Sequence, residues 1–338
     1  MYDPNTLYID PFLTNFAVGW RPANYFGDIV MPQSRVGTKS GQYRVFDRSN
    51  RLIFQSRREP GTVANEIRGR KWSVDTFKTV QHSLQSPVLD EERRELASLG
   101  GLSNATFGGA LDINPETDAV ELIVGSLDRE HEKKIADLVR NTATYPVGNT
   151  TTLAGAQQFD DYTGGTASTS DPETVIKTAT RVIQGKTGLP PNLMLVPQMG
   201  VSWIEGHPRI RARYQNFSLA IENAWRILSG FQGRVVEIGV MDDVYNAADN
   251  VEANQVLASF WGKDIWIGYV DNADGVNVQT FGKTFVYPQP SGDLRPIDRW
   301  REENRKADLF RDTWEYDLKV VNSSAGYLIK NAFSTGAW

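Results

Sequence analysis

The chain has 338 residues, of which 40% are hydrophobic and 23% are charged, so it is long enough to bury a sizeable core. Its formal net charge of -5 excludes a generally basic protein that coats nucleic acid, and the absence of Cys excludes disulfides, thiolate metal sites and Cys nucleophiles. No apolar run approaches the ~20 residues that a membrane span needs, and the first residues lack a signal-peptide pattern. We therefore expect a soluble protein, made in the cytoplasm, without a membrane partner.

Residues 1–40 combine aromatic side chains with four prolines and show no sustained helical period. A segment of this kind cannot bury its own aromatic residues, so it packs either on its own domain or across a neighbouring subunit. We favour the second arrangement, an arm that lies on another copy of the chain. Phe12 and Trp20 are the candidate contact residues of this arm.

Residues 41–78 contain two alternating runs with Pro60-Gly61 between them, which predicts a long two-stranded hairpin. The segment has nine Lys and Arg and four Asp and Glu, a charge of +5, so the rest of the chain carries -10. Because such a hairpin is only marginally stable alone in water, we expect it to lie on an acidic surface of another copy. Its candidate contact residues are Arg48, Arg51, Phe54, Arg57, Arg58, Arg68, Arg70 and Trp72.

The clearest helix signal follows a short charged helix predicted at residues 86–96. Asn114 can cap the new helix, Pro115 suits its first position, and the acidic residues that follow complement its positive end. Apolar residues then recur every three or four positions, which predicts a helix over about 115–142. His131 lies on the apolar stripe, and we interpret it as a packing residue and not as a ligand.

The remainder of the chain alternates short helices and strands after a connection rich in Gly, Ser and Thr. A helix is predicted from Pro172, capped by Ser170 or Asp171, and a strand pair is predicted within 255–281, turned at Asp274-Gly275. The segment from 295 onward is expected to form a charged helix and a final strand. Further elements are expected at 192–197 (strand), 197–206 (helix) and 233–240 (strand).

Patterns that could carry catalysis are weak. The GKT tripeptide at 185–187 ends a helix and lacks the upstream Gly of a phosphate-binding loop, and the scattered histidines match no metal or triad motif. Neighbouring acids are usually solvated, but a hydrolase that uses them stays an alternative, as does a nucleic-acid-binding module. We expect no catalytic residue, no cofactor and no metal. The acid pairs are Asp160 with Asp161, Asp242 with Asp243, and Glu302 with Glu303.

Taken in order, these elements resemble the major capsid proteins of tailed bacteriophages, which have the Johnson fold of the Hong Kong 97 type. The resemblance covers essentially the whole chain and is carried by "PGTVANEIRGRKWSVDTFKTVQHSLQSPVLDEER", "DAVELIVGSLDREHEKKIADLV" and "AGYLIKNAF". It implies an α+β fold that contains a long spine helix. The implied division is an N-terminal arm at 1–40, an extended loop at 41–80, a peripheral domain with the spine helix at 81–196, an axial domain at 197–312 and a return to the peripheral domain at 313–338.

The resemblance also implies a structural protein of the virion that is not an enzyme. Hexamers and pentamers would assemble in the host cytoplasm into an icosahedral head that encloses double-stranded DNA without sequence-specific binding. A portal protein and separate scaffold and cement proteins would be its partners. Residues 42–70 contain no Lys, unlike members that cross-link this loop to a neighbour's Asn, so non-covalent contacts are expected. An encapsulin-like cellular nanocompartment shell is the alternative with the same fold.

Overall fold

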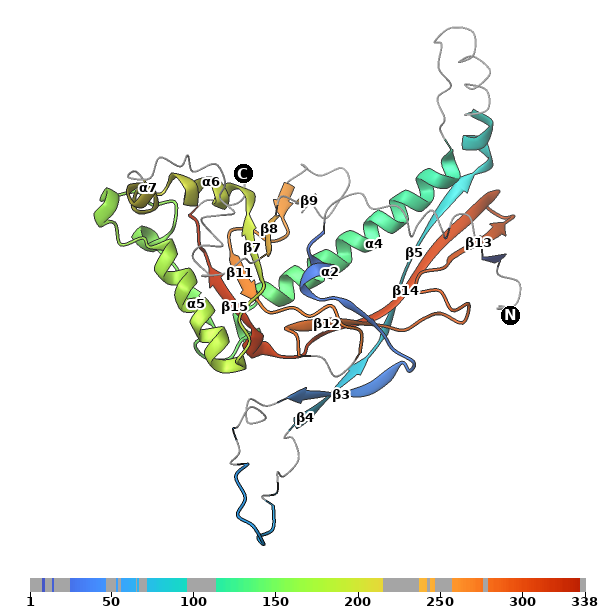
Figure 1. The fold of residues 1–338 in the computed structure, drawn as a ribbon. Coiled ribbons are helices and arrows are strands. Elements are labelled where there is room, and N and C mark those ends of the chain that lie inside the picture. Colours follow the sequence, from blue (N-terminus) through green and yellow to red (C-terminus); the bar gives the residue numbers. More distant parts are fainter. Residues whose placement is uncertain are drawn as a thin grey trace.

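The structure is a computed structural model, and it describes residues 8–9, 14, 25–46, 53, 56–64, 66, 72–95, 114–214, 237–241, 244–246, 257–275 and 279–334. Two large sheets and one long helix dominate these residues (Figure 1). The α+β class expected from the sequence is confirmed. None of the helices in the described ranges is long and apolar enough to cross a membrane.

The first large sheet has six strands and is organised around its longest strand, β14. One edge of β14 pairs with β5, and the opposite edge pairs first with β13 and then with β12, all antiparallel. The short strand β1 extends the sheet beyond β13, and β2 joins β12 in parallel. The strands are β1 (Tyr8–Ile9), β2 (Gln33–Arg35), β5 (Val80–Leu89), β12 (Gly282–Val286), β13 (Ile297–Glu302) and β14 (Ala307–Val320).

The second large sheet has five strands in the order β6-β15-β11-β7-β8. Its β7, β11 and β15 are apolar runs that are buried almost throughout, as expected for strands covered on both faces. Helix α5 (Pro172–Thr187), capped by Asp171 as predicted, packs on one face through Ile176, Ala179 and Ile183. The strands are β6 (Thr150–Thr152), β7 (Leu193–Pro197), β8 (Glu237–Met241), β11 (Ile265–Gly268) and β15 (Gly326–Lys330).

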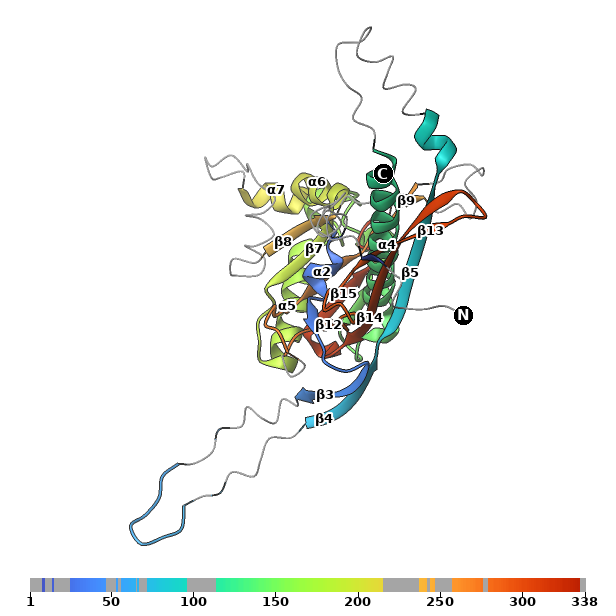
Figure 2. The same cartoon turned by 90° about the vertical axis from the view of Figure 1, so that its right-hand side faces the viewer.

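The long helix α4 (Pro115–Arg140) confirms the helix predicted from the sequence. The Asn114 Oδ1 atom accepts a hydrogen bond from the Glu116 N–H at 3.1 Å, and Pro115 occupies the first turn. Its N-terminal half packs on the six-stranded sheet, and its C-terminal half packs on the five-stranded sheet (Figures 1 and 2). The helix is therefore the shared support of both sheets.

The shorter elements connect these layers. Helix α2 (Gly27–Val30) packs against α4, and helices α6 (Gln198–Gly206) and α7 (Pro208–Tyr214) follow β7. Strands β9 and β10 form a separate antiparallel pair, as do β3 and β4. The bounds of these strands and of the 3-10 helices are β3 (Ser40–Phe46), β4 (Trp72–Lys78), β9 (Val244–Asn246), β10 (Leu257–Ser259), η3 (Thr142–Thr144), η4 (Gly155–Gln157), η5 (Gly165–Ala167) and η6 (Ser323–Ala325).

The charged helix predicted after residue 295 is wrong, because β13 and β14 form an antiparallel hairpin there. Both strands carry acidic and basic residues, and pairing sets opposite charges beside one another. Arg311 lies 2.7 Å from Asp298, and Arg299 lies 3.0 Å from Asp308. Cross-strand ion pairs, and not the faces of a helix, account for the high charge of this segment.

Two further expectations need correction. The strands on either side of Asp274-Gly275 do not pair with each other, because β11 belongs to the five-stranded sheet and β12 to the six-stranded one. The chain does fold back there, since the Phe281 N–H donates to the Tyr269 carbonyl at 3.0 Å. Residues 86–89 extend β5, and the predicted charged helix begins only at Asp90.

The described part of residues 1–40 packs on its own chain. Val30 and Met31 are fully buried in the core, and the Thr14 hydroxyl accepts a hydrogen bond from the Ile297 N–H at 3.2 Å. Strands β1 and β2 complete sheet edges within the chain, while the expected contact of the arm with a neighbouring copy stays a prediction. Phe12 and Trp20 lie outside the described residues.

The expected domain boundaries stay a prediction, but they do not follow the sheets. Strand β14 runs unbroken across the boundary expected at 312/313. The five-stranded sheet takes β6 and β7 from the expected peripheral domain, β8 and β11 from the axial domain, and β15 from the returning segment. A division by sheets would group residues 150–268 with residues 326–330.

Candidate functional site

The hairpin of β3 and β4 protrudes from the body of the molecule (Figures 1 and 2). The strands pair in one antiparallel register from Ser40 opposite Lys78 to Phe46 opposite Trp72, which confirms the hairpin predicted from alternation. Residues 56–64 lie beyond the paired strands and are exposed throughout. Two apolar side chains between β3 and β4 lie almost fully in solvent: Ile53 is 99% exposed and Val63 is 88% exposed.

The root of the hairpin is anchored in a small apolar cluster. Tyr43 and Phe77 are buried against Phe285 of β12, and the Phe77 and Phe285 ring centroids are 4.6 Å apart. The Tyr43 hydroxyl donates to Asp75 at 2.7 Å. Burial, together with this hydrogen bond, raises the pKa of Tyr43, while the same hydrogen bond and that from the Thr76 N–H lower the pKa of Asp75.

Acidic side chains of β14 also hold the root of the hairpin. The Glu315 carboxylate accepts hydrogen bonds from Lys39 Nζ at 3.1 Å and from the Thr79 hydroxyl at 2.9 Å. Asp317 accepts a hydrogen bond from the Lys78 N–H at 2.8 Å. A fixed root and an exposed tip make the hairpin a projecting arm that can reach another molecule.

Only part of the predicted contact set lies in the described residues. Arg57 and Arg58 are exposed on the distal part of the hairpin, and Trp72 is 45% exposed with the Arg44 guanidinium 4.6 Å above its ring. The sequence reasoning did not select Val63, although an apolar residue beside the Pro60-Gly61 turn was an available signal. Phe12, Trp20, Arg48, Arg51, Phe54, Arg68 and Arg70 lie outside the described residues.

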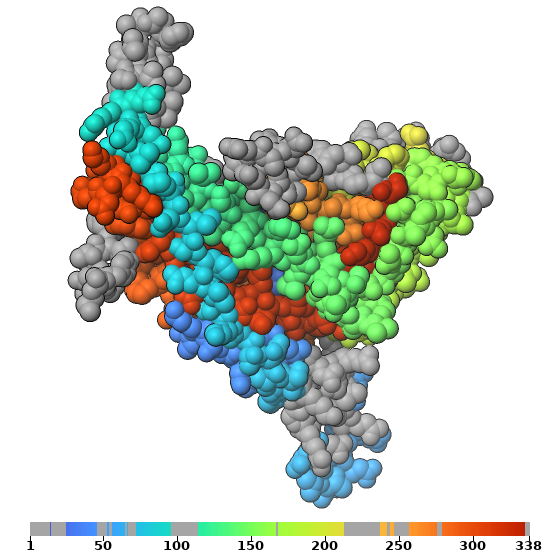
Figure 3. All heavy atoms as spheres, turned by 180° about the vertical axis from the view of Figure 1, so that it is seen from behind, coloured from blue at the N-terminus to red at the C-terminus, as the bar shows by residue number. Residues whose placement is uncertain are grey.

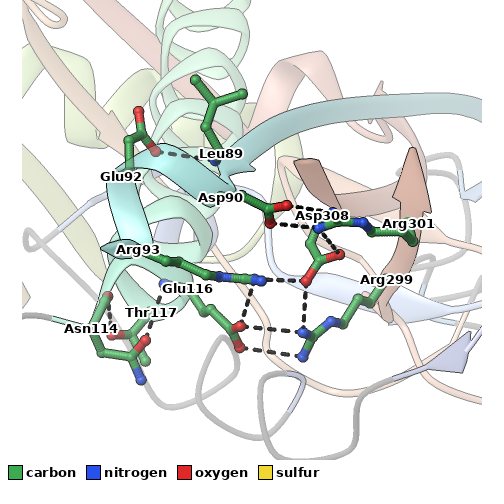
Figure 4. A network of polar contacts seen from close by, with 10 residues as sticks. All are labelled: Leu89, Asp90, Glu92, Arg93, Asn114, Glu116, Thr117, Arg299, Arg301 and Asp308. Atoms are coloured by element: carbon green, nitrogen blue, oxygen red, sulfur yellow. Dashed lines mark hydrogen bonds and ion pairs between the residues drawn. The ribbon is translucent and has the colours of Figure 1, made fainter. Parts of the chain in front are cut away.

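A network of six charged side chains lies at the other end of β5 (Figure 4). Three guanidinium groups and three carboxylates come from the helical turn after β5, the start of α4, and the β13–β14 hairpin. They bracket residues 96–113, which lie outside the described ranges. The six are Asp90, Arg93, Glu116, Arg299, Arg301 and Asp308.

Asp308 is the centre of this network. Its carboxylate oxygens lie 2.7 Å from Arg93, 3.0 Å from Arg299 and 3.3 Å from Arg301. Burial acts to raise the pKa of Asp308, but the hydrogen bonds from Arg93 and Arg299 outweigh it and lower the pKa. Asp90 binds Arg301 through both of its oxygens, at 2.7 and 2.6 Å, and this contact lowers the pKa of Asp90. Every carboxylate here is engaged, which favours a structural role.

A second ion cluster is buried between α4 and β14. Arg295 donates to Asp312 at 2.5 and 3.1 Å and to Asp128 at 2.5 Å, and its guanidinium lies 4.6 Å above the Trp314 ring. Burial acts to lower the pKa of Arg295, but the two carboxylates raise it, so the group stays charged. The cluster locks the helix onto the central strand.

The groups considered for catalysis have structural partners. Asp160 accepts a hydrogen bond from the Ser334 N–H at 2.8 Å, and Asp161 accepts one from the Thr163 N–H at 2.8 Å. His131 packs 4.5 Å from the Trp314 ring, and burial lowers its pKa to about 3, which confirms it as a packing residue. Within the described ranges, no group of three or more His, Cys, Asp or Glu could hold a metal.

The other two acid pairs differ in what the structure describes. Glu302 lies 3.7 Å from Arg305, and Glu303 lies 3.5 Å from Arg301, so both acids pair with Arg side chains where β13 turns into β14. Asp242 and Asp243 lie outside the described residues. The described acid pairs therefore lie in loops and at the end of β13.

Comparisons with known proteins show that the chain is similar to phage proteins. No protein-family model matches it. It is 25% identical over 323 residues to the major capsid protein of Burkholderia phage BcepMu, with 95% of each chain covered. It is 27% identical over 289 residues to the major capsid protein of Pseudomonas phage JBD67, with 82% of each covered. The chain is a relative of phage major capsid proteins. This confirms the resemblance drawn from its sequence.

Solved structures show that the fold is also that of phage capsid proteins. A phage-related protein from Bordetella bronchiseptica RB50 superimposes with a TM-score of 0.70 at 21% identity, covering 98% of this chain and 100% of the other. The capsid of cyanophage P-SCSP1u gives a TM-score of 0.54 at 11% identity, covering 92% and 89%. The Hong Kong 97 type of capsid fold is therefore confirmed. The assignment of β3–β4 to the extended loop and of α4 to the spine helix stays a prediction.

Proposed function

We propose that this chain is the major shell-forming protein of a tailed phage head, where hexamers and pentamers close into an icosahedral capsid around double-stranded DNA. The observation that carries the proposal is the hairpin, whose root is buried in its own chain while its tip exposes Ile53 and Val63 to solvent. The two relatives named major capsid protein match this chain over 95% and 82% of their own length, which supports the same role.

We propose that the hairpin binds to the surface of a neighbouring copy within the same capsomer. Apolar side chains such as Ile53, Val63 and Trp72 would supply contact energy, because burial of apolar surface is the main source of association free energy. Arg57 and Arg58 would fix partner choice and register, since each exposed ion pair contributes only about 0 to 1 kcal/mol. Many weak contacts would then add up in a closed shell.

The remaining roles are proposed on the same basis. A chain with a net charge of -5 would line a shell without gripping the packaged polyanion, so the DNA would be held without sequence-specific contacts. A portal protein and separate scaffold and cement proteins would complete the head in the host cytoplasm. A hydrolytic activity finds no support in the described acid pairs, which have backbone N–H or Arg partners.

Electron microscopy of the purified protein, alone and co-expressed with its genomic neighbours, tests the proposal together with light-scattering mass. We expect closed shells, or hexamers and pentamers, and nuclease-protected DNA in particles taken from a phage lysate. A stable monomer or dimer under every condition would overturn the proposal. Shells that enclose protein cargo and no DNA would assign the chain to a cellular nanocompartment.

A further inference from the structure

The outer edge of β5 is open along its central residues. Among the described residues, β5 pairs with β14 on one edge and with no strand on the other. Figure 3 shows β4 and β5 as a continuous cyan band at the surface of the molecule. A ten-residue edge strand of this kind presents a row of free backbone groups to solvent.

Hydrogen bonds at the two ends of β5 show which residues face outward. The Asp90 N–H donates at 3.0 Å to the carbonyl of Lys306, which precedes β14, whereas the Leu89 N–H turns away and donates to Glu92 at 3.3 Å. At the other end, the Thr79 N–H donates to the Lys39 carbonyl at 2.8 Å. Because residues of an antiparallel strand alternate between its two edges, the odd-numbered residues direct their N–H and C=O groups away from β14.

Three exposed residues, Gln81, Ser83 and Gln85, direct their backbone groups to the outer edge, where no described strand pairs with them. Pro87 belongs to the same set and has no N–H, so the far end of the edge is blocked, as Leu89 is by Glu92. The open window is therefore short and defined at both ends.

The composition of β5 favours pairing of this window with another strand. Natural edge strands are usually protected from pairing by charged residues, above all Lys. The sequence of β5, VQHSLQSPVL, has no Asp, Glu, Lys or Arg, in a chain where 23% of residues are charged. Two apolar side chains of β5 are exposed here: Val80, just before the open window, at 54%, and Leu84, within it, at 40%.

We propose that the occupant is β5 of a second copy, paired antiparallel across a two-fold axis at Ser83. The sequence Gln81-His82-Ser83-Leu84-Gln85 is symmetric about its centre in its outward residues, so Gln would face Gln and Ser would face Ser. The pairing brings no charge opposite another. Leu84 would lie diagonally across from Val80 and Leu84 of the partner subunit, within side-chain reach, which covers both exposed apolar residues.

This contact rests on the proposed function, for which it supplies one subunit interface of the shell. It is distinct from the hairpin, because it uses the free edge of the six-stranded sheet and a symmetric, self-complementary surface. Three facing pairs would each exchange two backbone hydrogen bonds. The contact therefore predicts which positions of two chains lie opposite each other.

Disulfide cross-linking tests this register, because the chain has no Cys and therefore no background. Facing residues of a hydrogen-bonded pair have Cα atoms about 5.5 Å apart, which suits a disulfide. The double variant Gln81→Cys with Gln85→Cys should form covalent dimers in assembled particles under mild oxidation. Gln81→Cys alone and Gln85→Cys alone are the controls and should not, since each Cys then faces a Gln; co-assembly of the two single variants should restore the cross-link.

The outcomes separate this contact from the proposed function. Shells without cross-linked dimers in the double variant would overturn the contact and leave the capsid role standing. Cross-linked dimers in a protein that never forms shells would support the contact and count against the capsid role. Neither shells nor dimers would overturn both.

A charge-pair experiment gives a second, independent readout. Gln81→Lys with Gln85→Lys sets like charges opposite each other and should reduce assembly at least tenfold at low salt. Gln81→Glu with Gln85→Lys sets opposite charges together and should restore it. Both variants alter the same two exposed positions, so equal assembly by the two would overturn the register.

Discussion

Glu132 is a carboxylate buried at 1% exposure on the core-facing side of α4. It accepts hydrogen bonds from the Phe26 and Gly27 N–H groups at 3.2 and 2.7 Å and from Trp261 Nε1 at 2.7 Å. We expect Glu132→Gln to lower the free energy of unfolding by about 2 kcal/mol, because hydrogen bonds to a charged acceptor are lost in a buried site. Chemical denaturation would measure the change.

The matched control for this prediction is Glu130→Gln on the same helix. The Glu130 side chain is 45% exposed and pairs with Lys134 at 2.5 Å on the helix surface. Since exposed ion pairs contribute little, its effect should stay below about 0.5 kcal/mol. Equal effects of the two substitutions would contradict the role assigned to Glu132.

Asp308 gives the charge network a pH dependence with a definite sign. Its folded pKa lies below the ordinary value of about 4, so its contribution to stability is full above that value and is lost as the pH falls through the folded pKa. Asp308→Asn should therefore be less stable than the native chain at neutral pH and lose less stability between pH 5 and 3. Thermal unfolding midpoints across this range measure it, with Asp293→Asn, at an exposed position, as the control that should follow the native curve.

Among the secondary-structure elements, α2 can pack closely on α4 because residue 27 is Gly. A Cβ at this position would lie 2.4 Å from the Glu132 Oε2 atom and 2.9 Å from the Ile135 Cδ1 atom. Gly27→Ala should therefore destabilise the fold by about 1 to 3 kcal/mol through overpacking. Differential scanning calorimetry of both variants measures the effect. In the control Gly37→Ala the added carbon meets nothing within 4 Å, so that variant should unfold close to the native midpoint.

The elements that the sequence predicted well are those defined by local signals. Asn114, Pro115 and the apolar stripe lie within one segment, so α4 could be predicted to within two residues of its end. The β13–β14 hairpin could not, because its charges acquire meaning only when Asp298 is paired with Arg311 across the turn. Strand partners far apart in the chain, such as β5 and β14, leave no local trace at all.

The candidate site likewise combines features that local sequence signals predict with features that depend on distant parts of the chain. Alternation predicted the hairpin, and composition predicted its charge, so Arg57, Arg58 and Trp72 were found on its surface. The support beneath it was not predictable, since Glu315 and Asp317 lie far along the chain and reach the root only through β14. The open edge of β5 likewise depends on which strand lies beside it.

At the scale of the whole molecule, the hairpin should affect assembly and leave folding unchanged. Reversing its exposed charge with Arg57→Glu and Arg58→Glu should reduce shell yield severalfold, because the tip would then have the same charge as the acidic surface expected on the neighbour. The thermal midpoint of the unassembled subunit should not change. Arg305→Glu, at a side chain 62% exposed in the β13–β14 turn, is the control. Equal loss of shells in both variants, scored by electron microscopy, would contradict the role assigned to the β3–β4 hairpin.

Helix α4 spans both large sheets, and its 26 residues correspond to a length of about 39 Å. A rod of that length, packed on one sheet at one end and on the other sheet at the other, suppresses bending between them. Subunits in pentamers and hexamers meet at different local curvatures. In such a shell, each subunit would behave as a rigid body. The change of angle would occur at the contacts between subunits, at the projecting hairpin and the strand edges.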